Sequence, residues 1–161
     1  SNKFDDIMTI SWIENGIKKA EKFACTTDPG KHWLVNSINS AGTAILKEGQ
    51  YIKSHAFGKH KRSGGYLSLT QINPVTVWRD RNGDQFYDFK NPQTGIFGIN
   101  IHKASTRNSG STQIDKWSAG CQVVSKPGSL SRILQVAKQA TRKVQQDKFT
   151  YTLINSRDIN I

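Results

Sequence analysis

The chain has 161 residues and a mass of 18.0 kDa, with 35% hydrophobic and 22% charged residues, which fits one globular domain over residues 1–161. The longest apolar runs, such as residues 96–101, are far shorter than the roughly 20 residues that span a bilayer, so we expect no membrane span. The 23 Lys and Arg residues outnumber the 12 Asp and Glu residues and give a formal net charge of +11. This charge favours an anionic partner such as nucleic acid, acidic lipid or cell-wall polymer.

The first 24 residues predict an amphipathic helix. Asp5 and Asp6 suit a helix N-terminus, and apolar residues follow at steps of three and four. These apolar positions are Phe4, Ile7, Met8, Ile13, Ile17, Ala20 and Ala24. Gly16 inside this segment lowers helix stability by about 1 kcal/mol relative to alanine.

The middle of the chain predicts a sheet. Short apolar or alternating runs separated by Gly, Asn, Asp and Ser indicate strands at residues 32–38, 66–71, 75–78, 86–89, 97–102 and 122–124. Residues 125–147 return to helical spacing with Pro127 in the first turn, and Phe149, Tyr151 and Leu153 then alternate as in a strand. The predicted fold class is α+β, with a mostly antiparallel sheet or sandwich and a helix at each flank.

Residues 95–124 carry the strongest signal for chemistry. His102 ends an apolar run, and Cys121 follows the small-residue turn Ser118-Ala119-Gly120 after a long polar loop. Loops longer than about 12 residues in compact domains are usually functional, and small residues let a substrate approach the backbone. The segment therefore predicts a Cys–His pair across a cleft.

Plainer interpretations of these two residues stay open. A cysteine among apolar residues is often a buried small hydrophobe, and a histidine at a strand end is often only a hydrogen-bonded structural group. Zinc is disfavoured because no histidine follows His102, and His32, His55 and His60 lack the spacing of zinc ligands.

The strand-borne histidine and the Ser-x-Gly-Cys turn resemble the L,D-transpeptidase (YkuD-like) catalytic domain. The resemblance covers roughly residues 41–125 and is carried by GIFGINIH and KWSAGCQVV. It implies a β-rich domain whose cysteine acts on peptidoglycan stem peptides through a thioester acyl-enzyme. By position, it implies that Cys121 is the nucleophile, His102 the base, and Ser118 and Gly120 the turn that shapes the oxyanion site.

Two positions depart from the family signature. Ala119 replaces its second histidine, so we expect a backbone carbonyl or a side chain such as His55 or His60 to orient His102. Val123 replaces the arginine or asparagine that binds the substrate carboxylate, so a cation from elsewhere is expected. The candidate cations are Lys53, Lys59, Lys61, Arg62 and Lys103, and the substrate-binding residues predicted in all are Arg62, Lys103, Trp117, Gln122 and His60.

Three further features each have a functional and a plain interpretation. The string DRNGDQFYD places Asp80, Asn82, Asp84 and Asp88 as in short calcium loops, but Asn82-Gly83 favours an ordinary hairpin tip. Residues 53–65 are either a basic flap over the cleft or a solvated loop. Cys25 has no histidine motif nearby and is expected to be structural.

We therefore expect a cysteine acyltransferase of L,D-transpeptidase type that needs no cofactor, located in the cell envelope, in the periplasm or outside the cell. The first alternative is a peptidoglycan peptide hydrolase on the same scaffold. The second is a non-catalytic basic module that binds wall polymer or nucleic acid. Nucleic acid is disfavoured because the chain has no helix-turn-helix, zinc-finger or RNP signature.

Overall fold

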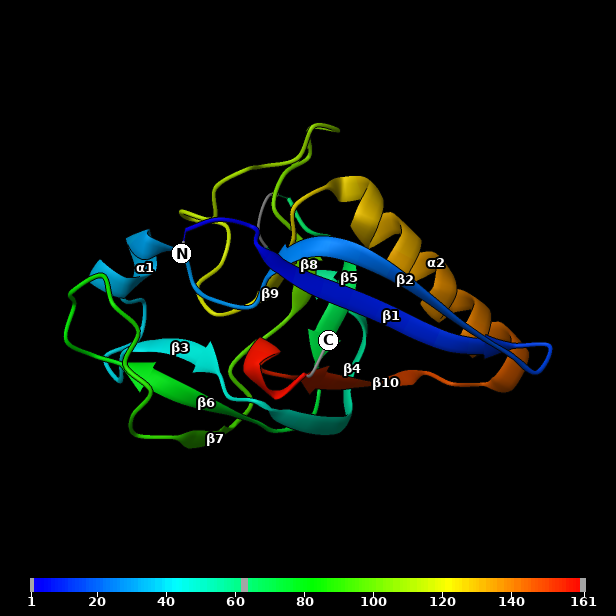
Figure 1. Cartoon of the computed structure of the whole chain (residues 1–161), viewed down its shortest axis with the longest axis horizontal. Helices are drawn as coiled ribbons and strands as arrows, with labels where there is room; N and C mark the ends of the chain where they lie inside the picture. The colour runs from blue at the N-terminus through cyan, green and yellow to red at the C-terminus, as the bar shows by residue number, and fades with distance from the viewer. Residues whose placement is uncertain (1, 62–63, 160–161) are drawn as a thin grey trace.

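The computed structural model describes residues 2–61 and 64–159 and has a mixed α+β fold with mostly antiparallel strands, which confirms the predicted class at that level (Figure 1). In chain order the elements are β1 (Asp6–Glu14), β2 (Ile17–Thr26), α1 (Lys31–Val35), β3 (Thr43–Leu46), β4 (Gly49–His60), β5 (Tyr66–Gln71), β6 (Val75–Asp80), β7 (Gln93–Gly95), β8 (Ile101–Lys103), β9 (Gln122–Val124), α2 (Pro127–Val144), β10 (Lys148–Leu153) and the 3₁₀ helix η1 (Ser156–Asp158). Within the described ranges, neither α-helix is long and apolar enough to cross a membrane.

The strands form two sheets. The larger has seven strands in the order β1-β2-β9-β8-β5-β4-β10, and the smaller has three in the order β3-β6-β7. All pairings within the sheets are antiparallel except that of β8 with β9, which is parallel. Figure 1 shows the small sheet at one end of the molecule and α2 at the other. The parallel pair matters for the site because it sets two strand ends side by side.

The predicted N-terminal helix is wrong, because this segment forms the long hairpin of β1 and β2. Asn15 and Gly16 have φ of 51° and 77°, as the two-residue turns of tight hairpins require, and Glu14 pairs with Ile17 across them. Met8 is buried, whereas Ile7 and Ile13 are 68% and 71% exposed. The apolar residues therefore lie on both faces of a ribbon, and their spacing resembles that of a helix by coincidence.

Several other boundaries also differ from the predictions. Residues 32–38 do not form a strand, because residues 32–35 belong to α1, and residues 86–89 lie in the loop between β6 and β7. Residues 53–60, predicted as part of a flap, belong to β4, which pairs on one side with β5 and on the other with β10. The structure confirms the strands predicted at 66–71, 75–78 and 122–124 and the strand around Phe149, Tyr151 and Leu153. It also confirms the helix predicted within 125–147, whereas 97–102 is a strand only from Ile101.

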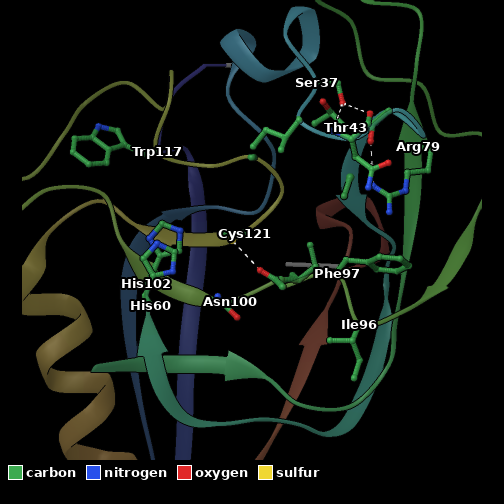
Figure 2. A pocket seen from close by; sticks show the side chains of 17 residues that line it. Ser37, Thr43, His60, Arg79, Ile96, Phe97, Asn100, His102, Trp117 and Cys121 are labelled. Atoms are coloured by element: carbon green, nitrogen blue, oxygen red, sulfur yellow. Dashed lines mark hydrogen bonds between the residues drawn. The ribbon is translucent and has the colours of Figure 1, made fainter. Parts of the chain in front are cut away.

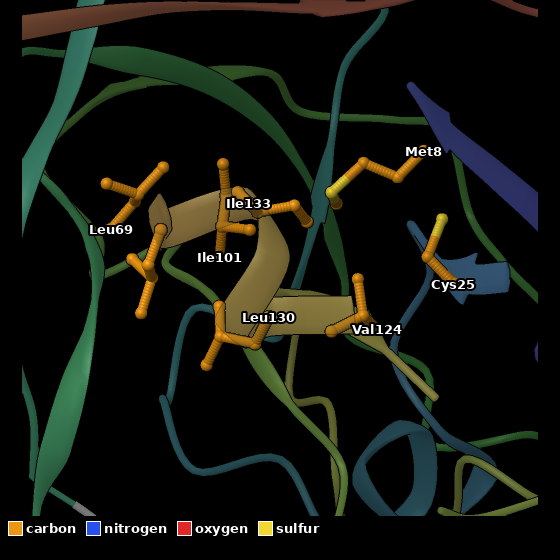
Figure 3. Packing of buried hydrophobic residues seen from close by; sticks show 8 residues of the cluster. Met8, Cys25, Leu69, Ile101, Val124, Leu130 and Ile133 are labelled. Atoms are coloured by element: carbon orange, nitrogen blue, oxygen red, sulfur yellow. The ribbon is translucent and has the colours of Figure 1, made fainter. Parts of the chain in front are cut away.

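The main core lies between α2 and the large sheet. Leu130 and Ile133 of α2 pack with residues from β1, β5, β8 and β9, and Cys25 is fully buried in this cluster (Figure 3). Burial raises the pKa of the Cys25 thiol to about 12, with a smaller contribution from Asp6. Cys25 is therefore an unreactive packing residue, as the sequence predicted.

Replacing Asp28, which lies between β2 and α1, is expected to stabilise the folded state above neutral pH. Burial, followed by the nearby charge of Asp6, raises the pKa of its carboxyl from 3.8 to about 6. The folded state holds this proton more tightly than the unfolded chain does, so ionisation above pH 6 destabilises the fold and acidification below pH 4 removes the penalty. We expect Asp28→Asn to raise the free energy of unfolding at pH 8 by up to about 3 kcal/mol and to change it little at pH 4.

Denaturant unfolding at the two pH values checks this, with the exposed Asp147→Asn as the matched control. A variant that is no more stable than the parent at pH 8, or that gains as much at pH 4, would contradict the assignment.

Candidate active site

The parallel pairing of β8 and β9 brings Cys121 and His102 together. Ile101 pairs with Gln122 and His102 with Val123, so Cys121, directly before β9, comes opposite Asn100. The amide of Gln122 donates to the carbonyl of Asn100 at 2.9 Å and fixes this register. Cys121 and His102 line one cavity of about 430 Å³ (Figure 2).

The turn that carries Cys121 is closed by its own residues. Ser118 Oγ donates to the carbonyl of Cys121 at 2.8 Å and accepts from the amide of Gly120 at 3.1 Å. Gly120 has a φ of 119°, and a Cβ there would lie 2.4 Å from the carbonyl oxygen of Ala44. Only glycine fits this backbone, and its amide is used inside the turn rather than aimed at a substrate. Ser118 and Gly120 therefore shape the site by holding Cys121 in place.

The backbone of residues 97–99 also contacts the thiol. Cys121 Sγ donates to the carbonyl of Gly98 at 3.3 Å, the dashed line beside Cys121 in Figure 2. The side chain of Gln71 fixes this segment, because its Oε1 accepts from the amides of Phe97 and Ile99 at 3.0 Å each. The cysteine is only partly buried, so a substrate in the cavity can reach its thiol. The Ser118 turn and the carbonyl of Gly98 hold the residue in place.

The ring of His102 is oriented by a backbone carbonyl, as expected from the loss of the family's second histidine. Its Nδ1 lies 2.9 Å from the carbonyl oxygen of Lys103, and the Tyr66 hydroxyl donates to the same oxygen at 3.1 Å. A carbonyl oxygen only accepts, so Nδ1 carries the proton of the neutral ring. Nε2 is then the nitrogen that can take a proton.

His60, at the end of β4, stacks on His102. The ring centroids are 4.1 Å apart with planes 19° from parallel, and both rings line the cavity. His55, the other residue considered for this role, does not contact His102 in this way. Its Nε2 donates to the carbonyl of Ile99 and its Nδ1 accepts from Ser54, each at 2.8 Å, and burial lowers its pKa. His60 is thus the positioning histidine, and His55 is a core residue.

We expect His60 to support the reactivity of Cys121 through its stacking on His102 and not through proton transfer. His60→Ala leaves one face of the His102 ring unsupported, which should slow iodoacetamide modification of Cys121 at pH 7 by about 3- to 10-fold, the size of one aromatic contact. His60→Phe keeps a flat ring and should retain most of the rate. If the phenylalanine variant is as slow as the alanine variant, the imidazole itself is required.

The predicted substrate-binding residues fall into different places. Trp117 is 39% exposed and lines the cavity, as does His60. Gln122 is fully buried, and its amide donates to the carbonyls of Thr27 and Gly120, so it does not line the cavity. Lys103 places its ammonium 4.7 Å from the centroid of the Tyr66 ring, away from the cavity lining. Arg62 lies outside the described residues.

Two residues of the cavity, Arg79 and Asn100, were not predicted from the sequence. Arg79 is the only Lys or Arg among the described residues that line the cavity, whereas Lys53, Lys59 and Lys61 do not line it. Asn100 faces Cys121 in the parallel register and also lines the cavity. The sequence carried a signal for Arg79, because it follows Val75 and Val77 at alternate positions on the buried face of β6.

The proposed calcium string lies in the loop after β6. Asn82 and Gly83 do lie in the loop that joins two antiparallel strands, but the tight two-residue turn is wrong, because β6 pairs with β7 at residues 93–95 and not with residues 86–89. The amide nitrogen of Asn82 donates to Asp84 at 2.9 Å and to Asp88 at 3.1 Å, while Asp80 accepts from the amide of Asp88. Among the described residues no three His, Cys, Asp or Glu side chains are grouped as a metal site would need. Calcium binding at these residues stays a prediction from the sequence.

Comparison of the chain with family models, with curated proteins and with solved structures yields no match. No family is assigned by these comparisons. A functional assignment therefore rests on the residues of the cavity and on the sequence motif around Cys121.

Proposed function

We propose that this protein is a cysteine-dependent acyltransferase of L,D-transpeptidase type that acts on peptidoglycan stem peptides. The observation that carries the proposal is the arrangement of a partly exposed thiol on a glycine turn beside a histidine whose Nδ1 proton is held by a carbonyl. The resemblance of KWSAGCQVV to the YkuD-like signature supplies the substrate class. This substrate places the protein in the cell envelope or outside the cell.

The chemistry divides between the two residues. His102 Nε2 takes the proton of the Cys121 thiol, and the thiolate attacks a peptide carbonyl to form a tetrahedral intermediate. The intermediate collapses to a thioester as the amine leaves with the proton from His102. A second amine, or water in the hydrolytic alternative, then attacks the thioester and releases the thiol. The histidine matters most for placing the thiolate and protonating the departing amine.

Asn100 can supply a side-chain donor for the oxyanion. Its Oδ1 accepts from the amide of Gln71 at 3.0 Å, which leaves the Nδ2 group as the donor on a residue that lines the cavity. The register places this residue opposite Cys121. A donor fixed before the reaction stabilises the charge that develops on the carbonyl oxygen.

Incubation of the purified protein with muropeptides, followed by mass analysis of the products, tests the proposal. Cross-linked dimers are the expected product, and shortened or separated peptides would indicate the hydrolase alternative. Unchanged muropeptides, under conditions in which the protein is folded, would contradict the proposal and favour a non-catalytic basic module. Cys121→Ala is the control for contaminating enzymes.

A further inference from the structure

Arg79 is a buried cation without a carboxylate partner among the described residues. It is 5% exposed, and burial, with a lesser effect of the positive charge of Arg81, lowers the pKa of its guanidinium, which stays charged. Nε donates to the side-chain oxygen of Gln93 at 2.9 Å, and Nη1 donates to the carbonyl of Gly42 at 3.1 Å. Both acceptors are neutral, and the ion pairs of the described chain lie elsewhere.

Arg79 is connected to the cysteine turn through β3. Ala44 is its direct partner in the antiparallel pairing of β3 and β6. The carbonyl oxygen of the same Ala44 is the atom that excludes a side chain at Gly120, the residue before the cysteine. One strand therefore separates Arg79 from the turn.

Arg79 is connected to the thiol a second time through residues 97 and 98. The guanidinium lies 4.7 Å from the centroid of the Phe97 ring, and the next residue, Gly98, provides the carbonyl that accepts from Cys121 Sγ. Figure 2 shows Arg79 and Phe97 on the side of the cavity opposite His60 and His102. Cys121 and Arg79 both line the cavity, so a molecule that fills it can contact the thiol and the guanidinium together.

The chemistry of the guanidinium selects the ligand. It has five N–H donors in a planar fork, of which the two described bonds use two, and the fork matches a carboxylate through paired hydrogen bonds. A buried cation is costly unless it is paired, so a cavity with such a group favours an anionic occupant. The stacked Phe97 ring keeps the plane of the fork fixed.

We propose that Arg79 is the carboxylate-binding residue of this cavity, so that Cys121 acts on acyl donors that carry a free carboxylate at a fixed distance from the reacting carbonyl. This inference rests on the proposed function, since it assumes a reactive Cys121. It assigns the role lost at Val123 to Arg79, rather than to the lysines and Arg62 that the sequence suggested.

Thiol-directed labels with and without a carboxylate test the proposal. Bromoacetyl-glycine, bromoacetyl-β-alanine and bromoacetyl-γ-aminobutyrate place the charge at increasing distance from the reacting carbon, and their amides serve as neutral partners. In each case Cys121 sulfur displaces bromide and forms a thioether, which intact mass and peptide mapping detect. For at least one length we expect the carboxylate to react about tenfold or more faster than its amide in the parent protein at pH 7.

Arg79→Gln should remove this preference, measured as the ratio of the carboxylate rate to the amide rate within each variant. Arg81→Gln removes the same charge two residues along the chain, at a side chain that donates to the carbonyl of Ala41, and should keep the preference. Arg79→Lys keeps the charge without the fork and should give an intermediate preference. It also provides the test if the glutamine variant fails to fold, which thermal unfolding and loss of the neutral-label rate would reveal.

The outcomes separate this inference from the proposed function. Rapid neutral labelling of Cys121 with no carboxylate preference at any length, or with a preference that Arg79→Gln retains, would overturn the role of Arg79 alone. An equal loss in Arg81→Gln would overturn it as well, because the effect would then be general electrostatics. If neither kind of label modifies Cys121 faster than the buried Cys25, the proposed function and this inference both fail.

Discussion

We expect Cys121→Ser to abolish acyl transfer, with a loss of at least about a thousandfold in product formation from muropeptides. The hydroxyl can still donate to the carbonyl of Gly98, so the turn should persist and Tm should change little. An alcohol, however, ionises far less readily than a thiol and cannot form the thioester. Mass analysis of the products, with thermal unfolding of the same preparation, measures both effects.

Cys25→Ala is the control for this experiment. Its side chain lies in the main core, so the substitution should lower stability but leave turnover per folded molecule unchanged. Near-normal turnover in the Cys121→Ser variant, or an equal loss in the Cys25→Ala variant, would remove Cys121 from the mechanism.

The second large effect is expected for His102→Gln. An unpaired thiol of pKa about 8.5 is roughly 3% ionised at pH 7, and stronger ionisation is partly offset by weaker nucleophilicity. The histidine should therefore contribute mainly by placing the thiolate and protonating the leaving amine. We expect muropeptide turnover to fall by about 100-fold or more even at pH 9.

Iodoacetamide separates these contributions, because its leaving group needs no proton. At pH 9 we expect Cys121 to be alkylated at similar rates in the parent and in the His102→Gln variant, although their turnover differs. His32→Gln, a change outside the cavity lining, is the control and should behave as the parent. Equal falls in alkylation and turnover at pH 9 would instead indicate that the variant has displaced the thiol.

The sequence was most informative where one periodicity dominates. Residues 125–147 have a single apolar helical face, and the structure places α2 there at Pro127–Val144. The first 24 residues have apolar side chains on both faces of a hairpin, so spacing alone could not exclude a helix, and Asn15-Gly16 was the decisive signal. β4 is rich in Gly, Lys and His and is held by its two neighbours, so its conformation depends on tertiary pairing rather than on local propensity.

The residues of the site likewise divide into those that a local motif predicts and those that tertiary pairing brings in. Cys121, Ser118 and Gly120 lie within four consecutive residues, so one motif was enough to suggest their arrangement. Arg79 reaches the cavity through tertiary pairing, because β6 pairs with β3 and sets Arg79 beside Ala44, which also lines the cavity. Lys103 directly follows His102 in sequence, yet its ammonium lies over the Tyr66 ring, so closeness in sequence does not determine where a side chain lies.

The central claim is that Cys121 is an activated thiol, and iodoacetamide modification of the native protein between pH 6 and pH 9 tests it most directly. Peptide mapping reports Cys121 and Cys25 separately in one sample, so the buried cysteine is an internal reference. We predict that Cys121 is modified readily well below pH 8.5, whereas Cys25 is modified only after unfolding. Equal and slow modification of both cysteines across this range would contradict the account.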